Sequence, residues 1–595
     1  MKIFSKAAKE ANPISAWSII RPYWVSEDRW PARGLLIFVL ALNLGIVYIN
    51  YRLNEWNVGF YNALQTRNSK EFFAALGEFS ILAFIFIVLS VAATYFQQML
   101  EFRWRRWITT HYIDRWLNQH TFYRIQRDQL ADNPDQRISD DLQALASTTL
   151  SLTLDLLPTL VTLATFTTIL WALSGPLAFT LAGVHLSIPG YLVWAAVFYA
   201  LVGSYVIYKA AHPIVGVRYQ QQRVEANFRF SLIRVRESAE EIALYDALDT
   251  EARQLNGVFG AIRDNWQQVM RFTRRLTLVS SLYGQGAIIF PFFAASPGYF
   301  AGKLSLGVLM QISSAFGQVS NSMSWFINSF STLATWRATV NRLREFQRVL
   351  DTQHYGEIIS PAVASGGIKR HLVTDSVLRV SDLSLALPNG SPLSTIGSLV
   401  IKPGSRWLVR GPSGAGKSML FRALAGLWPF GEGTIEFPIS AHALFIPQRS
   451  YIPIGSLRAA ICYPADVSVF DDAACQTALE ACHLHQYTSR LDDTAHWENV
   501  LSPGEQQRLA LARVLLTEPD FVFLDEATSA LDAHTEEQVY QTLVDRLPDT
   551  AIISIAHRQT LAVYHENVLE VRPIAAAEAA SQGPSAPPSP LPSLA

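Results

Sequence analysis

The chain has 595 residues, more than one hydrophobic core usually supports, so at least two domains are expected. Charged residues make up 16% of the sequence and hydrophobic residues 50%, a balance that favours membrane-embedded segments over a fully soluble protein. The formal net charge of -1 excludes the global basic field typical of a nucleic-acid-binding protein.

The N-terminal part predicts an interfacial helix followed by membrane spans. It contains no short apolar run that ends in a cleavage site, so no removable signal peptide is predicted. The aromatic and basic stretch AWSIIRPYWVSEDRW (16–30) predicts a helix that lies in the headgroup layer. A bilayer-crossing helix needs about 20 largely apolar residues. Stretches free of Asp, Glu, Lys and Arg occur at 34–51, 79–100, 156–208, 276–302 and 304–336.

The stretch 156–208 is long enough for two spans, with SGP (174–176) and SIPG (187–190) marking a turn between them, so six spans are predicted in a membrane domain of residues 1–345. With the N-terminus inside, the four inner segments carry 28 lysines and arginines, whereas the three outer segments carry 4. Buried helices of a soluble protein have no reason to follow this bias, which predicts a multi-pass protein in a lipid bilayer with everything after residue 337 in the cytosol.

Two inner segments, 101–141 and 209–275, are long and rich in both arginines and aromatic residues. They predict helices that extend the spans into the cytosol and dock on a protein surface there. Glu78 and Asp155 are lone carboxylates near the ends of spans, and the simplest interpretation is that they reach the membrane interface.

Residues 346–372 lose the apolar pattern and gain Pro and Gly, so they are predicted to be a linker. From 373 to 570, strand-like runs such as RWLVR and FVFLDE alternate with helical runs, which predicts an α/β domain with a mostly parallel sheet. Cys462, Cys475 and Cys482 form no CxxC motif and predict no disulfide framework. The tail 571–595 is rich in Ala, Ser and Pro and is predicted to be disordered.

The stretch GPSGAGKS matches the phosphate-binding pattern G-x-x-x-x-G-K-[ST] after a strand and before a helix. Its backbone amides and helix N-terminus favour phosphate, the lysine reaches the terminal phosphates, and the serine is a Mg²⁺ ligand. The predicted ATP-binding residues of this loop are Gly411, Pro412, Ser413, Gly414, Ala415, Gly416, Lys417 and Ser418.

The run FVFLDE (521–526) places two carboxylates at the end of an apolar strand. Asp525 is predicted to hold Mg²⁺ through water, and Glu526 to polarise the water that attacks the terminal phosphate. The alternative, that both residues cap a helix, is weaker because the other motifs surround them.

Between these motifs, LSPGEQQRLALAR (501–513) resembles the signature of an ABC ATPase. The resemblance implies that Gln448 in IPQ is the Q-loop glutamine, which assists catalysis and metal binding, and that His557 in SIAHR is the switch histidine. It implies that Asp532 in SALD is the D-loop aspartate. In this family two ATPase domains enclose ATP, so Ser502 and Gly504 would act on a partner's nucleotide.

The sequence departs from the family pattern at two places. Pro503 replaces the first glycine after the signature serine, and Glu505 replaces the commoner glutamine. Leu387 stands where an aromatic residue normally stacks on adenine, so the base is expected to be held loosely.

In the membrane half, NEWNVGFYNAL (54–64), NPDQRISDD (133–141) and EANFRFSLIRVRESAEEIALY (225–245) resemble the SbmA/BacA-like transporters that carry a fused ATPase, and the last two stretches also resemble ABC subfamily D. The resemblance implies six transmembrane helices of exporter-type fold joined to a P-loop ABC ATPase, and a homodimer in the bacterial inner membrane. The first group implies peptide or cobalamin-like cargo, and subfamily D implies fatty acyl cargo. The direction of transport stays open.

The last span carries a polar stripe at helical spacing, formed by Gln311, Ser314, Gln318, Asn321, Trp325 and Asn328. Such residues either join helices or line a path, and six in a row favour a path for a bulky amphiphile. No Lys or Arg occurs between 304 and 336, which disfavours acyl-CoA cargo. An ATP-gated channel would share every motif, whereas a soluble ABC ATPase would lack the spans.

Overall fold

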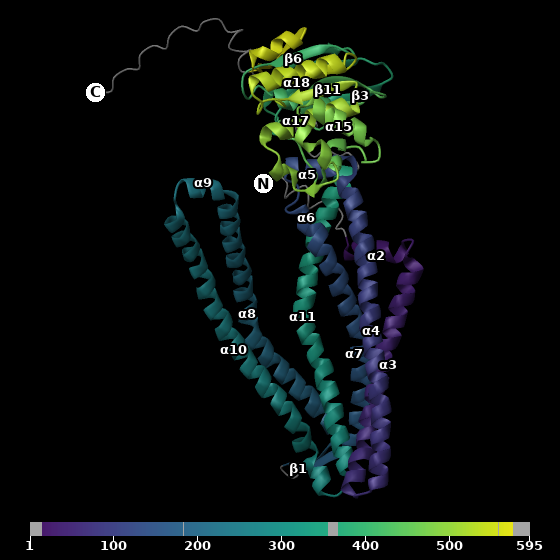
Figure 1. The fold of residues 1–595 in the computed structure, drawn as a ribbon. Helices are drawn as coiled ribbons and strands as arrows, with labels where there is room; N and C mark the ends of the chain where they lie inside the picture. Colours follow the sequence, from purple (N-terminus) through teal and green to yellow (C-terminus); the bar gives the residue numbers. More distant parts are fainter. Residues whose placement is uncertain (1–14, 182–183, 355–366, 557, 575–595) are drawn as a thin grey trace, which may run out of the picture. The chain divides into compact units, whose positions relative to one another are not determined.

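The computed structural model describes residues 15–181, 184–354, 367–556 and 558–574 (Figure 1). The chain divides into two compact units, Met1–His354 and Tyr355–Ala595. All the predicted spans fall in the first unit, and all the predicted nucleotide-binding motifs fall in the second.

The first unit is built almost entirely of helices, several of them far longer than a bilayer is thick. Its helices are α2 (Ala16–Val25), α3 (Arg29–Gln65), α4 (Ser69–Leu117), α5 (Thr121–Asp128), α6 (Pro134–Gln136), the π-helix η2 (Arg137–Asp141), α7 (Leu142–Ser174), α8 (Tyr191–Glu237), α9 (Ala239–Leu244), α10 (Leu248–Phe300) and α11 (Leu306–His354). Each predicted span lies within one of the long helices, as expected where no water can satisfy backbone groups.

Among the described residues, five helices are long and apolar enough to cross a membrane: α3, the α4 segment, the α7 segment, α8 and α10. The predicted sixth span lies in α11, which has sufficient length but is not among these five. Its polar stripe explains the difference, because Gln, Ser and Asn lower the mean hydropathy of the helix.

The stretch predicted as a simple turn between α7 and α8 instead forms a β-hairpin. Strand β1 (Pro176–Leu181) pairs antiparallel with β2 (Val184–Pro189). The predicted Gly/Pro signals therefore mark the ends of a hairpin and not a tight connection.

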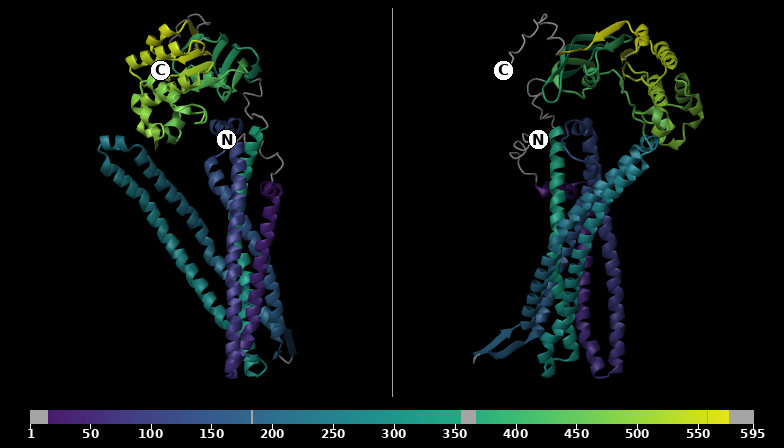
Figure 2. Two further views of the ribbon diagram at one scale, coloured as in Figure 1. Left: turned by 45° about the vertical axis from the view of Figure 1, so that its right-hand side comes forward. Right: turned by 90° about the vertical axis from the view of Figure 1, so that its left-hand side faces the viewer.

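The long helices lie in adjacent pairs: α3 beside α4, α7 beside α11, and α8 beside α10 (Figures 1 and 2). Helix α11 also packs on α3 and α8, so it is central to the unit. One buried cluster joins α2, α4, α7 and α11 around Trp104 and Leu142, and a second joins α7, α8, α10 and α11 around Phe166 and Phe316. Large apolar side chains outside these clusters, such as Phe84, are exposed, as a lipid-facing surface requires.

Polar contacts fix α3 against neighbouring helices. The Asn54 side chain donates to the backbone oxygen of Gln311 at 3.0 Å. A Cβ added at Gly307 would lie 2.4 Å from the Val58 oxygen, so glycine permits this close approach of α11 to α3. Glu78, predicted to be a lone carboxylate, is in fact paired with Arg52 at 3.1 Å.

Asp155, the other predicted lone carboxylate, accepts a hydrogen bond from the Ser151 hydroxyl one turn earlier, at 3.2 Å. Its environment is thus local to α7, and the structure gives it no cationic partner among the described residues.

A buried carboxylate links η2 to α11. Asp141 accepts from Arg137 Nη1 at 2.9 Å and from Arg342 through Nε at 2.9 Å and Nη2 at 2.5 Å. The Asp141 side chain is 6% exposed. Arg137 belongs to the segment 101–141, which was expected to dock on a protein surface, but its side chain points into its own unit.

The domain boundaries differ from the predicted ones. Residues 346–354, expected in the linker, continue α11 to His354, and the next strand, β3, begins at Lys369, before the expected start at 373. Of the predicted tail, residues 575–595 lie outside the described part of the chain.

The second unit contains two five-stranded sheets. The first is parallel, in the order β13-β6-β12-β11-β8, and the second is mostly antiparallel, in the order β14-β5-β4-β7-β3. The parallel sheet comprises β6 (Arg406–Arg410), β8 (Ala443–Ile446), β11 (Phe521–Asp525), β12 (Ala551–Ile555) and β13 (Asn567–Glu570); the other comprises β3 (Lys369–Val373), β4 (Leu378–Ala386), β5 (Pro392–Ile401), β7 (Gly431–Pro438) and β14 (Arg572–Pro573).

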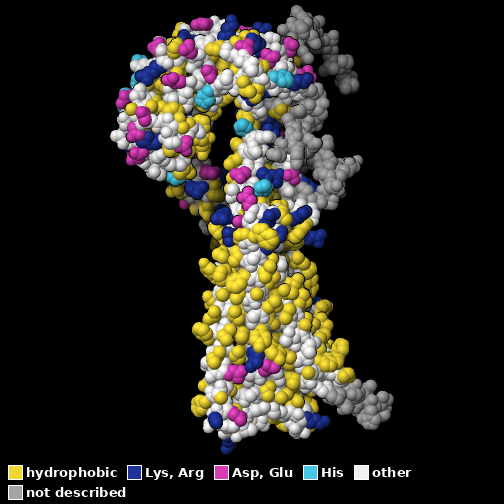
Figure 3. All heavy atoms as spheres, turned by 90° about the vertical axis from the view of Figure 1, so that its right-hand side faces the viewer, with side chains coloured by type: hydrophobic (Ala, Val, Ile, Leu, Met, Phe, Trp, Pro, Cys, Tyr) yellow, Lys and Arg dark blue, Asp and Glu magenta, His cyan; other side chains and the backbone are white. Residues whose placement is uncertain are grey.

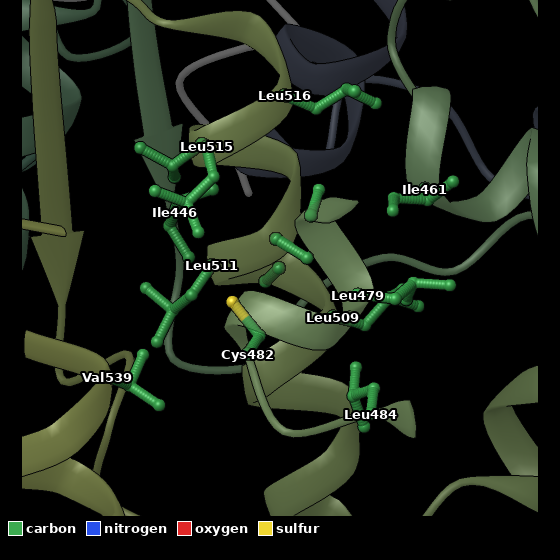
Figure 4. Packing of buried hydrophobic residues seen from close by; sticks show 14 of the residues in the cluster. Ile446, Ile461, Leu479, Cys482, Leu484, Leu509, Leu511, Leu515, Leu516 and Val539 are labelled. Atoms are coloured by element: carbon green, nitrogen blue, oxygen red, sulfur yellow. The ribbon is translucent and has the colours of Figure 1, made fainter. Parts of the chain in front are cut away.

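The helices of this unit include α13 (Lys417–Leu424), α14 (Leu457–Cys462), α15 (Asp472–Ala481), α16 (Trp497–Val500), α17 (Pro503–Thr517) and α18 (Ala533–Arg546). Helix α13 contacts β11, whereas α14 and α15 pack on α17. Most of helix α17 is buried: Leu511 and Leu515 pack near Ile446, and Leu509 packs near Leu479 (Figure 4). The three cysteines of this unit are free and buried.

We predict that Asp141→Asn destabilises the first unit, because it removes the charge that two arginines share. The loss should be on the order of 2 kcal/mol, below the value for a fully buried pair since the Arg342 side chain is 40% exposed. Thermal unfolding in detergent measures it. The control is Asp264→Asn, whose pair with Arg263 is exposed on both sides and should contribute almost nothing. Equal melting temperatures for Asp141→Asn and wild type would contradict the role of this network.

Candidate functional site

The parallel sheet brings together motifs that are far apart in the sequence. The phosphate-binding loop follows β6, Gln448 follows β8, and Asp525 ends β11. Because these strands are parallel, their carboxyl ends meet at one edge of the sheet, where α/β proteins bind ligands. The predicted switch histidine, His557, lies outside the described residues, but β12 ends at Ile555 at this same edge.

The loop 411–418 is shaped by its glycines. Gly414 and Gly416 have φ of 78° and 88°, which other residues rarely adopt. A Cβ at Gly411 would lie 2.5 Å from the Val571 oxygen, so a side chain there would push the loop away from the sheet. The resulting turn leaves the amides of the loop at the start of α13, where a helix N-terminus favours an anion.

Lys417 is folded back over its own loop. Its side-chain nitrogen donates to the Gly411 oxygen at 2.9 Å and to the Pro412 oxygen at 3.1 Å, and the residue is 8% exposed. In the described part of the chain, carbonyl oxygens hold this buried ammonium, and a phosphate group bound in the loop would compete with them for it.

Ser418 and Asp525 are brought together, as predicted for two residues that share a metal ion. Burial raises the pKa of Asp525, and the neighbouring Glu526 charge adds to this effect, while a hydrogen bond with Ser418 opposes it. A hydroxyl beside a carboxylate is the oxygen donor set that Mg²⁺ prefers, so these residues fit that ion.

Glu526 and Gln448 are also in contact. Gln448 Nε2 donates to Glu526 Oε2 at 2.9 Å, and the Glu526 amide donates to the Ile555 oxygen at 3.1 Å. Glu526 has φ of 50°, a left-handed conformation that is strained for a residue with a side chain. Such strain is typical of functional positions that the surrounding structure holds in place.

The start of α17 explains the two unusual residues of the signature, Pro503 and Glu505. Ser502 is the N-cap, and it exchanges hydrogen bonds with Glu505: Ser502 N donates to Glu505 Oε2 at 2.8 Å, and Glu505 N donates to Ser502 Oγ at 3.4 Å. Glutamate at this position completes a capping box, and Pro503 occupies the first helical position, where it costs no hydrogen bond. Burial would raise the pKa of Glu505, but hydrogen bonds from Ser502, Tyr487 and Gln486 lower it.

Ser502 and Gly504 are not brought to the phosphate-binding edge by the sheet topology. They begin α17, a helix that precedes β11, and follow none of the parallel strands. One copy of the chain therefore gives no topological reason for its own signature to meet its own phosphate loop.

Gln507 is a site residue that the sequence analysis missed. Its Nε2 donates to Ser529 Oγ at 3.2 Å and to the Glu526 oxygen at 3.4 Å, and its Oε1 accepts from the Ala530 amide at 2.8 Å. It is 6% exposed. It thereby ties the signature helix to the segment after Glu526. The helical pattern of α17 placed Gln507 on a helix but did not reveal these long-range partners.

The remaining predicted residues have local roles in the structure. The Asp532 carboxylate accepts from the amides of His534 at 3.1 Å and Thr535 at 3.0 Å, so it caps α18. Hydrogen bonds from the Thr535 side chain and backbone lower the pKa of Asp532 to about 2. Leu387 follows β4 and is 37% exposed, offering apolar area without a ring.

Comparisons with known proteins agree with this geometry. Residues 19–300 match a family model described as ABC transporter transmembrane region 2, and residues 396–529 match one described as ABC transporter. The chain is 33% identical to the inner membrane ABC transporter ATP-binding protein YddA of Escherichia coli, over 91% of this chain and 94% of that protein. It is 31% identical to ABC transporter D family member 2, chloroplastic, of Arabidopsis thaliana, over 93% and 85%.

A more distant relative is the lysosomal cobalamin transporter ABCD4 of Mus musculus, 27% identical over 91% of this chain and 92% of that protein. Among solved structures, a bacterial Atm1-family ABC exporter with ATP bound matches with a TM-score of 0.68 and 18% identity, covering 91% of this chain and 93% of that one. This last match shows a common fold.

We predict that Gln507→Ala slows ATP hydrolysis on the order of tenfold while leaving ATP affinity nearly unchanged, because the residue positions the segment after Glu526 and touches no phosphate-loop residue in the described contacts. Steady-state turnover and nucleotide titration separate the two quantities. Gln506→Ala is the matched control, since the neighbouring Gln506 donates to the Glu498 oxygen instead. Equal turnover in both variants would show that Gln507 has no positioning role.

Proposed function

Because this chain belongs to the ABC transporter family, as a half-transporter of the YddA and D-family kind that couples ATP hydrolysis to transport, we propose that two identical copies assemble to move a bulky amphiphilic solute across the membrane. The observation that carries the proposal is that the site is split. The phosphate loop and the proposed catalytic glutamate lie at the edge of the parallel sheet, whereas the signature serine begins a helix elsewhere in the unit.

The homodimer is supported by this split and by exposed apolar residues. Each chain supplies one phosphate loop and one signature, so two copies complete two sites. The cytosolic extensions of α8 and α10 expose Tyr219 (73%), Phe230 (69%) and Trp266 (47%). These residues lie in 209–275, beyond the apolar spans, where lipid does not cover them, and a second copy would bury them.

We assign the steps of hydrolysis to residues of the sheet edge. The loop amides and Lys417 bind the phosphates, and Ser418 with Asp525 would hold Mg²⁺, which neutralises charge on the terminal phosphate. Glu526, held by Gln448, is the general base for the attacking water, with His557 assigned as a second catalytic residue on resemblance. Ser502, Gly504 and Asp532 complete the partner's site.

The proposed cargo class depends on the polar stripe of α11. Gln311, Ser314, Gln318 and Trp325 are half-buried and Asn321 is exposed, while Ile312, Phe316 and Val319 on the other face are fully buried against the neighbouring helices. The stripe is thus turned away from the packed core of its own copy. The side chain of Asn328 is outside the described ones.

An uncharged polar surface beside Trp325 suits an amphiphile with hydrogen-bonding groups, such as a peptide or a cobalamin-like compound. The mouse relative named as a cobalamin transporter is compatible with this choice. A lipid or fatty acyl cargo is the alternative, and an ATP-gated channel is a remote one.

We further propose that the protein lies in a bacterial inner membrane with its ATPase unit in the cytosol. The lysine and arginine bias of the inner segments supports this orientation, and the E. coli relative is named as an inner membrane protein. Within the two inner segments expected to dock on a protein surface, Glu240 on α9 is exposed, whereas Arg137 is engaged by Asp141.

We predict that Glu526→Gln retains ATP binding but reduces turnover at least about a hundredfold, because an amide cannot act as the base. Radiolabelled ATP binding and phosphate release measure both effects, and the particle mass in detergent with ATP should be that of two chains. Glu518→Gln, an exposed carboxylate in the same unit, is the control. Wild-type turnover in Glu526→Gln, or a hydrolysing particle of one-chain mass, would refute the base or the dimer respectively.

We predict that Gln318→Leu combined with Asn321→Leu weakens the stimulation of ATPase by cargo roughly thirtyfold while basal hydrolysis and assembly persist, because each of the two lost polar contacts is worth ~1 kcal/mol. A panel of peptides, cobalamin and acyl-CoA serves as cargo. Asn341→Leu, an exposed position near the inner end of α11, is the control. A double variant that fails to assemble would show that the stripe joins helices instead.

A further inference from the structure

A set of arginine and aromatic side chains lies where the apolar stretches of α3 and α4 reach the side proposed to be cytosolic. We propose that this surface, defined as Trp17, Arg21, Arg29, Trp30, Arg103 and Arg106, binds the headgroup of an acidic phospholipid from the inner leaflet. The inference rests on the proposed orientation of the membrane unit.

Helix α2 is fixed firmly enough to form part of a binding surface. Tyr23 is 0% exposed and stacks on Trp104 of α4, with ring centroids 5.7 Å apart and planes inclined by 8°. Trp24 packs against the same indole, edge to face, at 5.7 Å. Arg33 of α3 donates through Nη2 to the Trp24 oxygen at 2.8 Å. The three helices are therefore held together from the inside, which fixes where their outer residues emerge.

The outer face of this assembly carries large exposed aromatic rings. Trp17 is 60% exposed, Trp30 69% and Phe102 63%. Trp30 lies just before the uncharged stretch 34–51, Phe102 lies just after the uncharged stretch 79–100, and Trp17 lies on α2. Indole rings at such a level are typical of the headgroup region, where an apolar body and a polar N–H are both satisfied.

Arginines supply the positive charge of this surface, and the carboxylates of Glu27, Asp28 and Glu101 lie within a few residues of them in the sequence. Arg21, Arg29 and Arg106 are exposed and Arg103 is half-buried. In the described part of the chain, none of these four forms an ion pair with a carboxylate. Burial raises the pKa of Tyr23 to about 12 and the charge of Asp28 adds to this, while the charges of Arg103 and Arg106 act in the opposite direction.

Figure 3 shows this side of the membrane unit, with dark blue Lys and Arg side chains gathered at one end of the band covered by hydrophobic residues. Charge and apolar surface are thus continuous. Guanidinium groups bind phosphate through paired hydrogen bonds, and the adjoining apolar band would take acyl chains. A soluble phosphate compound would use the guanidinium groups but not the apolar band. A zwitterionic lipid would gain little from the positive charge of the arginines.

Native mass spectrometry of the purified full-length protein tests the proposal without depending on transport or ATP. The protein is delipidated and exposed to equal amounts of phosphatidylglycerol and phosphatidylcholine. We expect wild type to retain phosphatidylglycerol preferentially, and Arg103→Gln combined with Arg106→Gln to retain about thirtyfold less of it, because each arginine near the surface contributes about fivefold.

Arg223→Gln combined with Arg229→Gln is the charge-matched control, since both arginines are exposed on the cytosolic extension of α8, away from the proposed surface. If the first double variant has a lower melting temperature than wild type, Arg21→Gln combined with Arg29→Gln replaces it. Equal retention of the two lipids by wild type, an equal loss in variant and control, or displacement of the lipid by inorganic phosphate alone would each overturn the proposal.

Discussion

The chemistry of this protein depends on the carboxyl edge of one five-stranded parallel sheet. Because β6, β8, β11 and β12 all end there, residues more than a hundred positions apart become neighbours. In the order β13-β6-β12-β11-β8, a single strand, β12, separates β11 from β6, which leads into the phosphate loop. The Ser418–Asp525 and Gln448–Glu526 contacts depend on that order, and any change of strand order would separate them.

The same constraint explains why no described strand of this chain carries the signature to that edge. A sheet edge collects only the residues that come directly after its own strands, and the signature Ser502 begins a helix that leads into β11. That helix nevertheless contacts the edge, because Gln507 holds the segment after Glu526. A partner docking on Ser502 would therefore act on both sites, since the same helix carries the docking residue at its start and the Gln507 contact within it.

The sequence was most informative where function is carried by backbone shape and short spacing. The loop 411–418 could be predicted because its glycines are required by local conformation, and Asp525 because it ends an apolar strand. The partners of Gln507 and Asp141 could not, because they come from segments distant in sequence. The hairpin between α7 and α8 was missed for another reason: its residues are as apolar as the spans around it, and its flanking Gly and Pro signals do not distinguish a hairpin from a simple turn.

Helix α11 combines a central position among the long helices with a low mean hydropathy. It lies beside α3, α7 and α8, yet it is not among the five helices that are apolar enough to span a membrane by composition. A helix of this kind stays in the membrane only if its polar residues face protein or water. Its buried residues Ile312, Phe316 and Val319 face the neighbouring helices, which leaves the polar stripe directed elsewhere. The low hydropathy of α11 thus reflects a polar face that has to be kept away from lipid.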